Sequence, residues 1–581
     1  MKKIIILLVV VGASLLAAVF TPEHLVSLLH EHFAYYFIFA SFFLWLTYLS
    51  KLYFKQLKSI FLNHYGGLLL STILIGLIFC IAPPKFKVLS DETNLIGISM
   101  DMHQSKKATL PIKGFNLDYR PPDYTRIIDK RPLLYPLLVS FVHSLRGYSA
   151  YNGFVLNFLL GIGVLFVFYL LVCDHFSRFY AYLGILMVAS TPLFVIWVTS
   201  SGFETLNLFF IVFTLFLFSR VLAGKNIQNA ELLFLTLVLL AQCRYESAVF
   251  TVAVLFLLPM FLNKEAISKL SIITYITPVL FIPVVWLPRL YAGLPDINRV
   301  NEALIQAPSL YDAFSLSNLA ANSPKNLVAL LGLDPYLGFT PVISALSVAG
   351  VYLLTKKLII DYQNKSARYK TMWGFGAVTF GLLYFIQFSF YRGDLTIFTQ
   401  NRFAMTYLPF MVIPAIFFVH EILNNSKTAL KIVVVIFFVL HLVYFWPYGS
   451  QQRHTNVGLF PYEYNKTLQL LKDQFNSNSN LLVISDRPNV YLVQFKGAVD
   501  YEFANHNPDA ILNRYLREFD HVIVLQRFSY QTHTPLNANR LSNSYRLKEL
   551  RRINLTREIY LKIFEIIDPE FSSHHVKAYR N

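Results

Sequence analysis

Charge is scarce in this sequence. Asp, Glu, Lys and Arg make up 14% of its 581 residues, whereas soluble proteins average about 25%. Hydrophobic residues make up 55% and aromatic residues 16%. So little charge with so much apolar surface excludes a soluble multidomain protein and indicates a polytopic membrane protein.

Cysteine and nucleotide-binding motifs are also scarce. The three cysteines, Cys80, Cys173 and Cys243, lie in or beside apolar runs and form no CxxC motif, which excludes a disulfide framework. The chain contains neither a GxxxxGK[ST] nor a GxGxxG motif, which argues against an ATP-driven transporter. It also shows no internal repeat, whereas many secondary transporters are built from repeats.

Long apolar runs are abundant. A run of about 17–25 apolar residues can cross a bilayer as a helix. The basic start, MKKIIILLVV, has the layout of a signal peptide, but we expect it to remain as the first span because many spans follow. The runs predict about thirteen spans, at 3–20, 33–50, 66–82, 152–173, 179–198, 203–220, 229–243, 246–262, 270–290, 341–355, 371–390, 403–422 and 430–447.

The basic residues that give the net charge of +17 are distributed unevenly among the loops between these spans. Lys and Arg gather in alternate loops, and the short loops 21–32 and 199–202 have none. This positive-inside pattern places the N-terminus in the cytoplasm and assigns the basic residues to topology and anionic lipid rather than nucleic acid. It predicts a membrane domain over 1–447, with large outer loops at 83–151 and 291–340, and an outer domain over 448–581.

The C-terminal region changes character. NLLVISD (480–486) and HVIVLQ (521–526) read as strands, and so does the final YLKIFEII. NKTLQLLKDQF (465–475) and DAILNRYLREF (509–519) have helical spacing. The alternation predicts a small extramembrane α/β domain.

The first outer loop carries the most informative motifs. Asp91 and Glu92 follow the third span by a few residues, and carboxylates beside a membrane are costly and therefore functional candidates. They also fit a capping pair for a helix that begins near Thr93. KRPLLYP (130–136) opens a stretch with helical apolar spacing that is too short to span, and we expect it to lie in the membrane interface.

Together these motifs resemble those of the GT-C membrane glycosyltransferases, particularly the protein O-mannosyltransferases and the lipid A aminoarabinose transferases. The resemblance covers roughly residues 66–447 and continues through STPLFVIWVTSSGFE (190–204), CRYESAVF (243–250) and QNRFAMTYLP (400–409). It implies a GT-C-like fold and transfer of a sugar, with inversion, from a polyprenyl-phosphate donor. The implied acceptor is a lipid, a glycan or a protein hydroxyl on the outer face.

Such a transfer needs a base for the acceptor hydroxyl and cations for the leaving phosphate. Asp91 is the candidate base and Glu92 a supporting acid. Glu204 matches the position at which the similar enzymes carry a second functional acid. The candidate phosphate-binding residues, whose guanidinium forks match phosphate oxygens, are Arg131, Arg244, Arg392 and Arg402.

Each assignment has a plainer alternative. Arg402 fits an interfacial anchor and Glu204 a helix cap. Arg244 with Glu246, and Arg392 with Asp394, fit local ion pairs. Asp101 and His103 form a D-x-H motif, but without a second cluster they predict a solvated loop rather than a metal site, and dependence on a divalent cation is left open.

Two other functions fit the same residues. One is a lipid-carrier transporter or flippase that binds polyprenyl phosphate without catalysis, and the other is a scaffold whose outer domain binds partners. The compact outer domain favours a bacterial inner membrane protein with a periplasmic active face.

Overall fold

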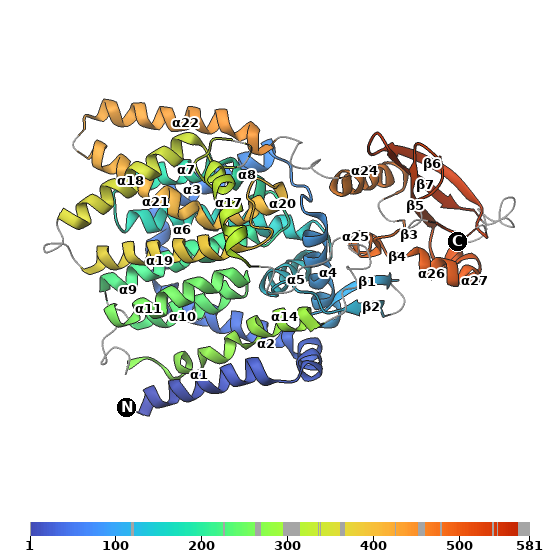
Figure 1. Cartoon of the computed structure of the whole chain (residues 1–581), viewed down its shortest axis with the longest axis horizontal. Helices are drawn as coiled ribbons and strands as arrows, with labels where there is room; N and C mark the ends of the chain where they lie inside the picture. The colour runs from blue at the N-terminus through green and yellow to red at the C-terminus, as the bar shows by residue number, and fades with distance from the viewer. Residues whose placement is uncertain are drawn as a thin grey trace. The chain divides into compact units, whose positions relative to one another are not determined.

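The chain forms two compact units in a computed structural model (Figure 1). The membrane unit comprises Met1–Pro84, Lys130–Leu138 and Gly153–His454, and the sheet unit comprises Lys85–Asp129, Val139–Asn152 and Thr455–Asn581. The structure describes residues 2–117, 121–224, 227–261, 269–293, 314–334, 336, 338–360, 367–424, 426–450, 459–476, 479–536, 540–542 and 544–567.

The membrane unit is helical, and its long helices lie with their axes roughly parallel (Figure 1). Its α-helices are α1 (Lys2–Phe20), α2 (Glu23–Tyr53), α3 (Leu57–Ile81), α6 (Asn152–Cys173), α7 (Arg178–Ala189), α8 (Pro192–Val198), α9 (Glu204–Gly224), α10 (Ile227–Ala241), α11 (Val249–Phe261), α13 (Ile272–Ile276), α14 (Ile282–Gly293), α17 (Leu316–Leu330), α18 (Pro341–Ile360), α19 (Ala367–Ser389), α20 (Phe398–Asn401), α21 (Leu408–Leu423) and α22 (Thr428–Ser450). Short 3₁₀ turns, η1 (Phe54–Gln56), η2 (Tyr245–Ala248), η3 (Thr277–Phe281) and η5 (Arg402–Tyr407), connect several of them.

The predicted polytopic helical fold is confirmed, and among the described residues each predicted span lies largely within helices. Within the described ranges, seven helical stretches are long and apolar enough to cross a membrane, or eight if a bent pair counts as one span. One stretch, Glu23–Ile81, has 59 residues and would measure roughly 90 Å as a straight helix, about three times the thickness of a bilayer core. It therefore covers two of the predicted spans. Four further apolar helices are shorter, and the number thirteen stays a prediction.

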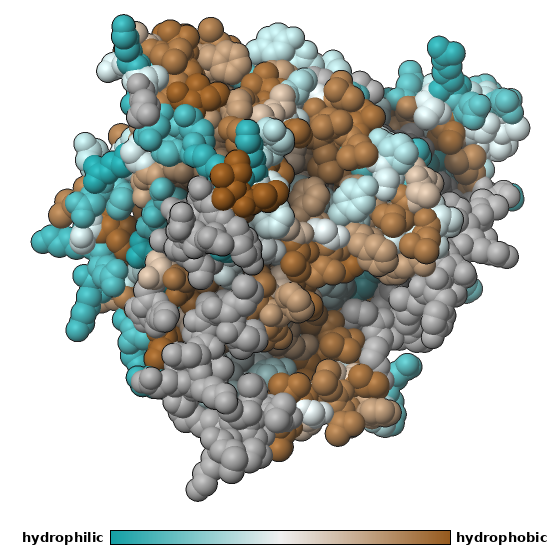
Figure 2. Space-filling model, turned by 60° about the vertical axis from the view of Figure 1, so that its left-hand side comes forward, coloured by the Kyte–Doolittle hydropathy of each residue, from teal (hydrophilic) through white to brown (hydrophobic). Residues whose placement is uncertain are grey.

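The helix surfaces match an apolar surrounding. Large side chains spaced four residues apart along α3 and α22 are about half exposed, which is the arrangement expected of a lipid-facing stripe. These are Leu69, Ile73 and Leu77 of α3, and Ile432, Ile436 and Leu440 of α22. Figure 2 shows one face of the molecule, on which broad brown, hydrophobic areas extend between groups of teal, hydrophilic side chains.

The predicted span 179–198 is not a straight helix. It consists of α7 and α8, whose axes differ by 70°. The break falls at Ser190 and Thr191, just before Pro192, which has no backbone N–H to continue the α7 hydrogen-bond ladder. The bend matters because α8 leads into the loop that precedes Glu204.

The sheet unit is an α/β structure, as predicted for the C-terminal region. Its elements are α4 (Leu89–Ser105), β1 (Leu110–Phe115), β2 (Asp123–Ile127), α24 (Leu459–Gln474), β3 (Leu481–Ile484), α25 (Pro488–Leu492), β4 (Gly497–Val499), α26 (Tyr501–His506), α27 (Pro508–Ala510), the π-helical turn η6 (Ile511–Tyr515), α28 (Leu516–Glu518), β5 (His521–Ser529), β6 (Leu547–Asn554) and β7 (Ile559–Ile566). The predicted interfacial helix is α5 (Leu134–Arg146), which begins in the membrane unit and ends in the sheet unit.

One seven-stranded sheet, of order β2-β1-β4-β3-β5-β7-β6, organises this unit. β3 pairs in parallel with β4 on one side and β5 on the other, while β1, β2, β6 and β7 pair antiparallel. A buried core that includes Phe115, Leu482, Tyr515, Val522 and Val524 joins the sheet to its helices. Because β1 and β2 come from the first outer loop, the unit is not built from the C-terminal residues alone, and the predicted division into 1–447 and 448–581 stays a prediction.

A buried histidine joins α4 to α5 inside the sheet unit. His143 lies 3.0 Å, through Nε2, from the Ser99 hydroxyl, and its Nδ1 lies 2.8 Å from the Asn152 amide nitrogen. The Asn152 amide also donates to the Gly147 carbonyl, so its nitrogen faces the ring and Nδ1 must accept. His143 is therefore neutral, and burial, with His103 nearby, lowers its pKa to about 3.

This histidine predicts a loss of stability in mild acid. Below a pH of about 6.5 the unfolded chain binds a proton at His143 that the folded chain refuses, so stability falls as pH falls from about 6.5 towards the folded pKa. We expect a loss of about 2 kcal/mol between pH 6.5 and 5 from this residue. Thermal unfolding of the detergent-purified protein at both pH values measures it.

The His143→Gln variant is the control for this prediction, because its amide offers both an N–H donor and an oxygen acceptor but does not titrate. Its melting temperature should fall less between the two pH values than that of the wild type. Equal pH dependence of the two proteins would show that His143 is not the group responsible.

Candidate functional site

The loop between α8 and α9 is buried and held in place from within the membrane unit. Ser200 and Ser201 have no exposed surface. The Asn157 amide of α6 donates to the carbonyls of Ser200 and Gly202, at 2.7 and 2.9 Å. These two hydrogen bonds satisfy backbone acceptors that have left helical geometry, and they fix the residue at which α9 begins.

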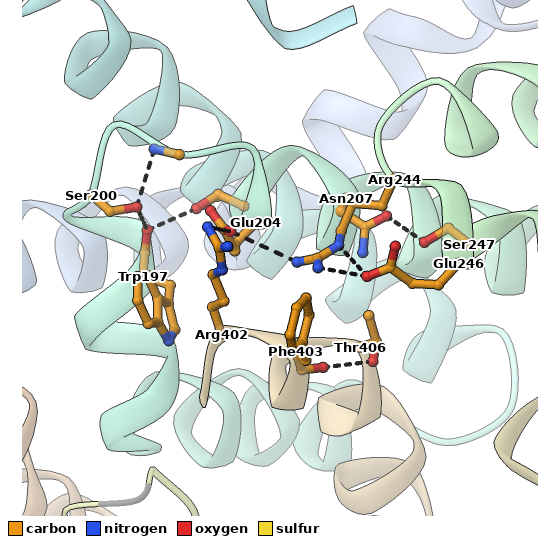
Figure 3. A network of polar contacts seen from close by, with 12 residues as sticks. Trp197, Ser200, Glu204, Asn207, Arg244, Glu246, Ser247, Arg402, Phe403 and Thr406 are labelled. Atoms are coloured by element: carbon orange, nitrogen blue, oxygen red, sulfur yellow. Dashed lines mark hydrogen bonds and ion pairs between the residues drawn. The ribbon is translucent and has the colours of Figure 1, made fainter. Parts of the chain in front are cut away.

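Glu204 is the first residue of α9 and is only 2% exposed. Its Oε1 lies 3.5 Å from Nη1 of Arg402 and 3.7 Å from Nη1 of Arg244 (Figure 3). A first-turn carboxylate is favoured by the helix dipole, so the plainer alternative, a carboxylate at the start of a helix, agrees with the structure. The two guanidinium groups show that Glu204 is also the centre of an ion-pair network.

Arg244 is paired more closely with Glu246. Its Nη2 and Nε lie 2.5 and 2.7 Å from Glu246 Oε1, so the local ion pair left open by the sequence exists. One aromatic ring adjoins both arginines, since the guanidinium carbons of Arg244 and Arg402 lie 4.5 and 5.6 Å from the ring centroid of Phe403. Such contacts orient guanidinium groups and favour their charge. We call Glu204, Arg244, Glu246 and Arg402 the arginine–glutamate network.

The network is electrically balanced but not fully hydrogen-bonded. Two arginines face two glutamates, and Glu204 Oε1 makes no hydrogen bond to the described part of the chain, because both arginine contacts exceed hydrogen-bonding distance. A guanidinium has five N–H donors. The arrangement therefore holds two positive groups in a buried place while leaving Glu204 able to release them towards another anion.

Gly202 has a steric role beside this network. A Cβ atom at residue 202 would overlap the Oε2 atom of Glu204. A larger residue at position 202 would therefore require the carboxylate of Glu204 to move. The SSGFE sequence thus couples the loop to the position of Glu204.

The other two predicted phosphate-binding arginines lie elsewhere in the membrane unit. Arg131 is 8% exposed, and the Tyr245 hydroxyl donates to the carbonyl of Lys130, which brings the backbone preceding Arg131 beside the residue that follows Arg244. Arg392 is exposed and its guanidinium carbon lies 5.2 Å from the ring centroid of Tyr391.

The local ion pair of Arg392 with Asp394, the plainer alternative that the sequence left open, is not formed. Asp394 instead pairs with Lys325, at 2.8 Å, and with the hydroxyl and amide of Thr396. Lys325 comes from α17, so the partner of Asp394 is set by a helix remote in sequence. Arg392 is not part of the arginine–glutamate network.

Asp91 and Glu92 lie in the first turn of α4, which begins at Leu89 rather than near Thr93. Glu92 is 2% exposed and its Oε2 accepts hydrogen bonds from the backbone N–H groups of Val88, at 2.7 Å, and Lys87. This satisfies donors at the helix start, so the capping alternative describes Glu92. Asp91 is half-buried in the same turn.

Lys87 is a residue that sequence reasoning missed. It is 4% exposed, and burial lowers the pKa of its ammonium group to about 7, with the Glu92 carboxylate opposing the shift. A lysine that titrates near neutral pH beside the carboxylate of Glu92 is a functional candidate in its own right. The one signal was its place between two proline residues and the acidic pair, which is weak.

Asp101 and Asp129 are held within the sheet unit. Asp101 is fully buried and its carboxylate lies 3.1 Å from Arg126 Nε and accepts from the Thr109 hydroxyl, so the predicted solvated loop around it is wrong. Asp129 accepts from the Asn94 amide at 3.0 Å. Within the described ranges, no three His, Cys, Asp or Glu residues form a group that could hold a metal ion.

The chain matches one family model over residues 130–291, described as dolichyl-phosphate-mannose-protein mannosyltransferase. The match includes KRPLLYP, the buried loop, Glu204 and Arg244. No curated protein matches the chain by sequence.

Several solved structures are similar. ArnT from Cupriavidus metallidurans, bound to undecaprenyl phosphate, has a TM-score of 0.51 at 10% identity, over 86% of this chain and 98% of that one. The oligosaccharyltransferase AglB from Archaeoglobus fulgidus, in complex with an inhibitory peptide and a dolichol-phosphate, has a TM-score of 0.43 at 12% identity, over 82% and 74% of the two chains. At such identities the likeness to ArnT concerns the fold.

Proposed function

We propose that this chain, which by its fold belongs to the GT-C superfamily of membrane glycosyltransferases, transfers a sugar from a polyprenyl-phosphate donor to an acceptor on the outer face of the membrane. The observation that carries the proposal is the arginine–glutamate network at the start of α9. Buried arginines held beside a releasable carboxylate suit a phosphate that gains charge during the reaction.

Arg244 and Arg402 are proposed to hold the donor phosphate. When the bond between the sugar and the phosphate breaks, the bonding electron pair leaves with the phosphate oxygen, and two guanidinium groups stabilise that charge. Glu204 keeps the arginines in place before the donor binds. Arg131 and Arg392 stay candidates for the same role, Arg131 because its segment adjoins residue 245.

Asp91 is proposed as the general base. It takes the proton of the acceptor hydroxyl while that oxygen forms its bond to the anomeric carbon, on the side opposite the departing phosphate, so that the configuration inverts. Glu92 accepts hydrogen bonds from the backbone N–H groups of Lys87 and Val88. These bonds support a structural role for Glu92, so proton transfer is assigned to Asp91. The GT-C resemblance supplies the inverting route.

Identifying the lipid-linked sugar donor tests the proposed function. In a strain that lacks the protein, mass spectrometry of the lipid extract should show a prenyl-phosphate sugar that accumulates relative to the wild type. The purified protein should then convert this lipid to free polyprenyl phosphate when acceptor is added. Assays with EDTA and with added Mg²⁺ or Mn²⁺ test whether a divalent cation takes part.

A flippase would give a different result. It would move the lipid between leaflets of a vesicle without releasing polyprenyl phosphate. Cell fractionation tests the remaining part of the proposal, a bacterial inner membrane location with a periplasmic active face.

A further inference from the structure

The parallel strands of the sheet unit create a second candidate site. From β3 the chain passes through α25 to β4 on one side, whereas β5, on the other side of β3, is followed in the chain by β6, which lies beyond β7 at the far edge of the sheet. The connections after β3 and β5 therefore diverge at their carboxyl ends. In open α/β sheets this switch point leaves a crevice in which ligands bind.

A crevice lies at this place, and its empty space, including the part open to solvent, is about 210 Å³. Because this figure includes space open to solvent, the crevice fits at most one small group and not a whole oligosaccharide. Its lining comprises Leu89, Phe460, Glu463, Tyr464, Asp486, Arg487, Val490, Tyr491 and Arg527.

Three of the charged side chains in the lining bind one another. Arg527 Nε and Nη2 lie 2.9 and 3.1 Å from the two carboxylate oxygens of Glu463, and Nη1 lies 2.8 Å from Asp486. Burial would lower the pKa of Arg527, but the two carboxylates raise it above its ordinary value. Arg527 is therefore a fixed structural cation that neutralises much of the acidic charge.

The fourth charged side chain, Arg487, takes no part in these ion pairs. Its guanidinium carbon lies 3.3 Å from the ring centroid of Phe460. The guanidinium makes no hydrogen bond or ion pair with any described residue, although the Arg487 backbone N–H donates to the Ser485 hydroxyl. Burial lowers the pKa of this guanidinium, and the carboxylates of Asp486 and Glu463 oppose the shift. Arg487 is thus pre-oriented by an aromatic ring with its donors available.

We infer that this crevice binds an oxyanion, a phosphate or carboxylate carried by the acceptor molecule, through the guanidinium of Arg487. The fork of donors matches two oxyanion oxygens, and the stacking on Phe460 reduces the entropy lost on binding. Leu89 lines the crevice two residues before Asp91, so within this unit an anchored acceptor is held near the proposed base. The inference rests on the proposed transferase function and adds the chemical class of the acceptor.

The test measures stabilisation of the full-length detergent-purified protein by three probes: inorganic phosphate, glucose 6-phosphate and glucose. Both phosphates, but not glucose, should raise the melting temperature of the wild type. In Arg487→Gln the half-saturating concentration of each phosphate should rise about tenfold or more, as expected for lost hydrogen bonds to a charged group. Arg487→Lys, which keeps the charge but not the fork, should show a smaller rise.

Arg514→Gln is the matched control, since Arg514 is a surface arginine of the same unit with a side chain 54% exposed. Unchanged phosphate responses in Arg487→Gln would overturn the inference. A response to inorganic phosphate but not to glucose 6-phosphate would also overturn it, because the crevice would then hold free phosphate rather than an acceptor group. Stabilisation by undecaprenyl phosphate reports on the arginine–glutamate network instead. If undecaprenyl phosphate did not stabilise the protein, that result would count against the proposed function and not against this site.

Discussion

The Asp91→Asn enzyme is expected to transfer sugar about 10²–10⁴-fold more slowly than the wild type. Asparagine has nearly the same shape as aspartate but cannot take the proton of the acceptor hydroxyl. Because Asp91 is half-buried at the start of α4 and the carboxylate of Glu92 keeps the backbone bonds of that turn, the variant should fold normally. The initial rate of polyprenyl phosphate release, with donor and acceptor saturating, measures the effect.

Two variants accompany this experiment. Asp123→Asn removes an exposed carboxylate of the same loop, at the start of β2, and should transfer sugar at the wild-type rate. Glu92→Gln should lower the melting temperature, because a neutral amide accepts the N–H groups of Lys87 and Val88 less strongly. An Asp91→Asn protein as fast as the wild type would remove Asp91 from the mechanism and favour transport of the lipid over transfer of its sugar.

Replacing Arg402 by methionine should reduce both stability and activity. The change leaves the buried Glu204 with the more distant Arg244 as its ion-pair partner. Removing one partner of a buried ion pair typically costs 3–5 kcal/mol, and we expect about 3 kcal/mol because Arg244 remains. Transfer should fall by about 10²-fold or more, since a cation that stabilises the leaving phosphate is lost. Thermal unfolding and the release assay measure the two effects.

A second change separates structure from function in this network. In the Arg402→Met, Glu204→Gln double variant the weakly paired carboxylate is gone, so much of the stability should return, while the activity should not. Arg220→Met is the matched control, because Arg220 forms its ion pair with Asp174, at 2.8 Å, and not with a residue of the network. A double variant with wild-type activity would exclude Arg402 as a phosphate-binding residue.

Local features of the chain predicted the helical part of the fold well. The run 152–173 coincides with α6, because a long apolar stretch satisfies its backbone hydrogen bonds internally whatever surrounds it. The strands β3, β5 and β7 were also found from short runs rich in β-branched residues. The bend between α7 and α8 was missed, although Pro192 marked it.

The first outer loop shows where local reasoning fails. β1 and β2 were not predicted, and Gly114 and Phe115 of β1 pair with Ala498 and Gly497 of β4. Strand pairing between segments so far apart depends on the partner rather than on the run itself. In the same way, the closeness of Arg392 and Asp394 in the sequence suggested a local ion pair, whereas the partner of Asp394 is Lys325 of a remote helix.

The sequence by itself determined that this is a polytopic helical membrane protein with an α/β extramembrane part and the motifs of a GT-C enzyme, because hydropathy and short motifs are properties of neighbouring residues. Only the tertiary structure decided which charges meet. Glu204 became the partner of Arg244 and Arg402, Glu92 a helix-capping acid, and Arg487 an available cation, because a buried charge takes its role from partners that come from other elements.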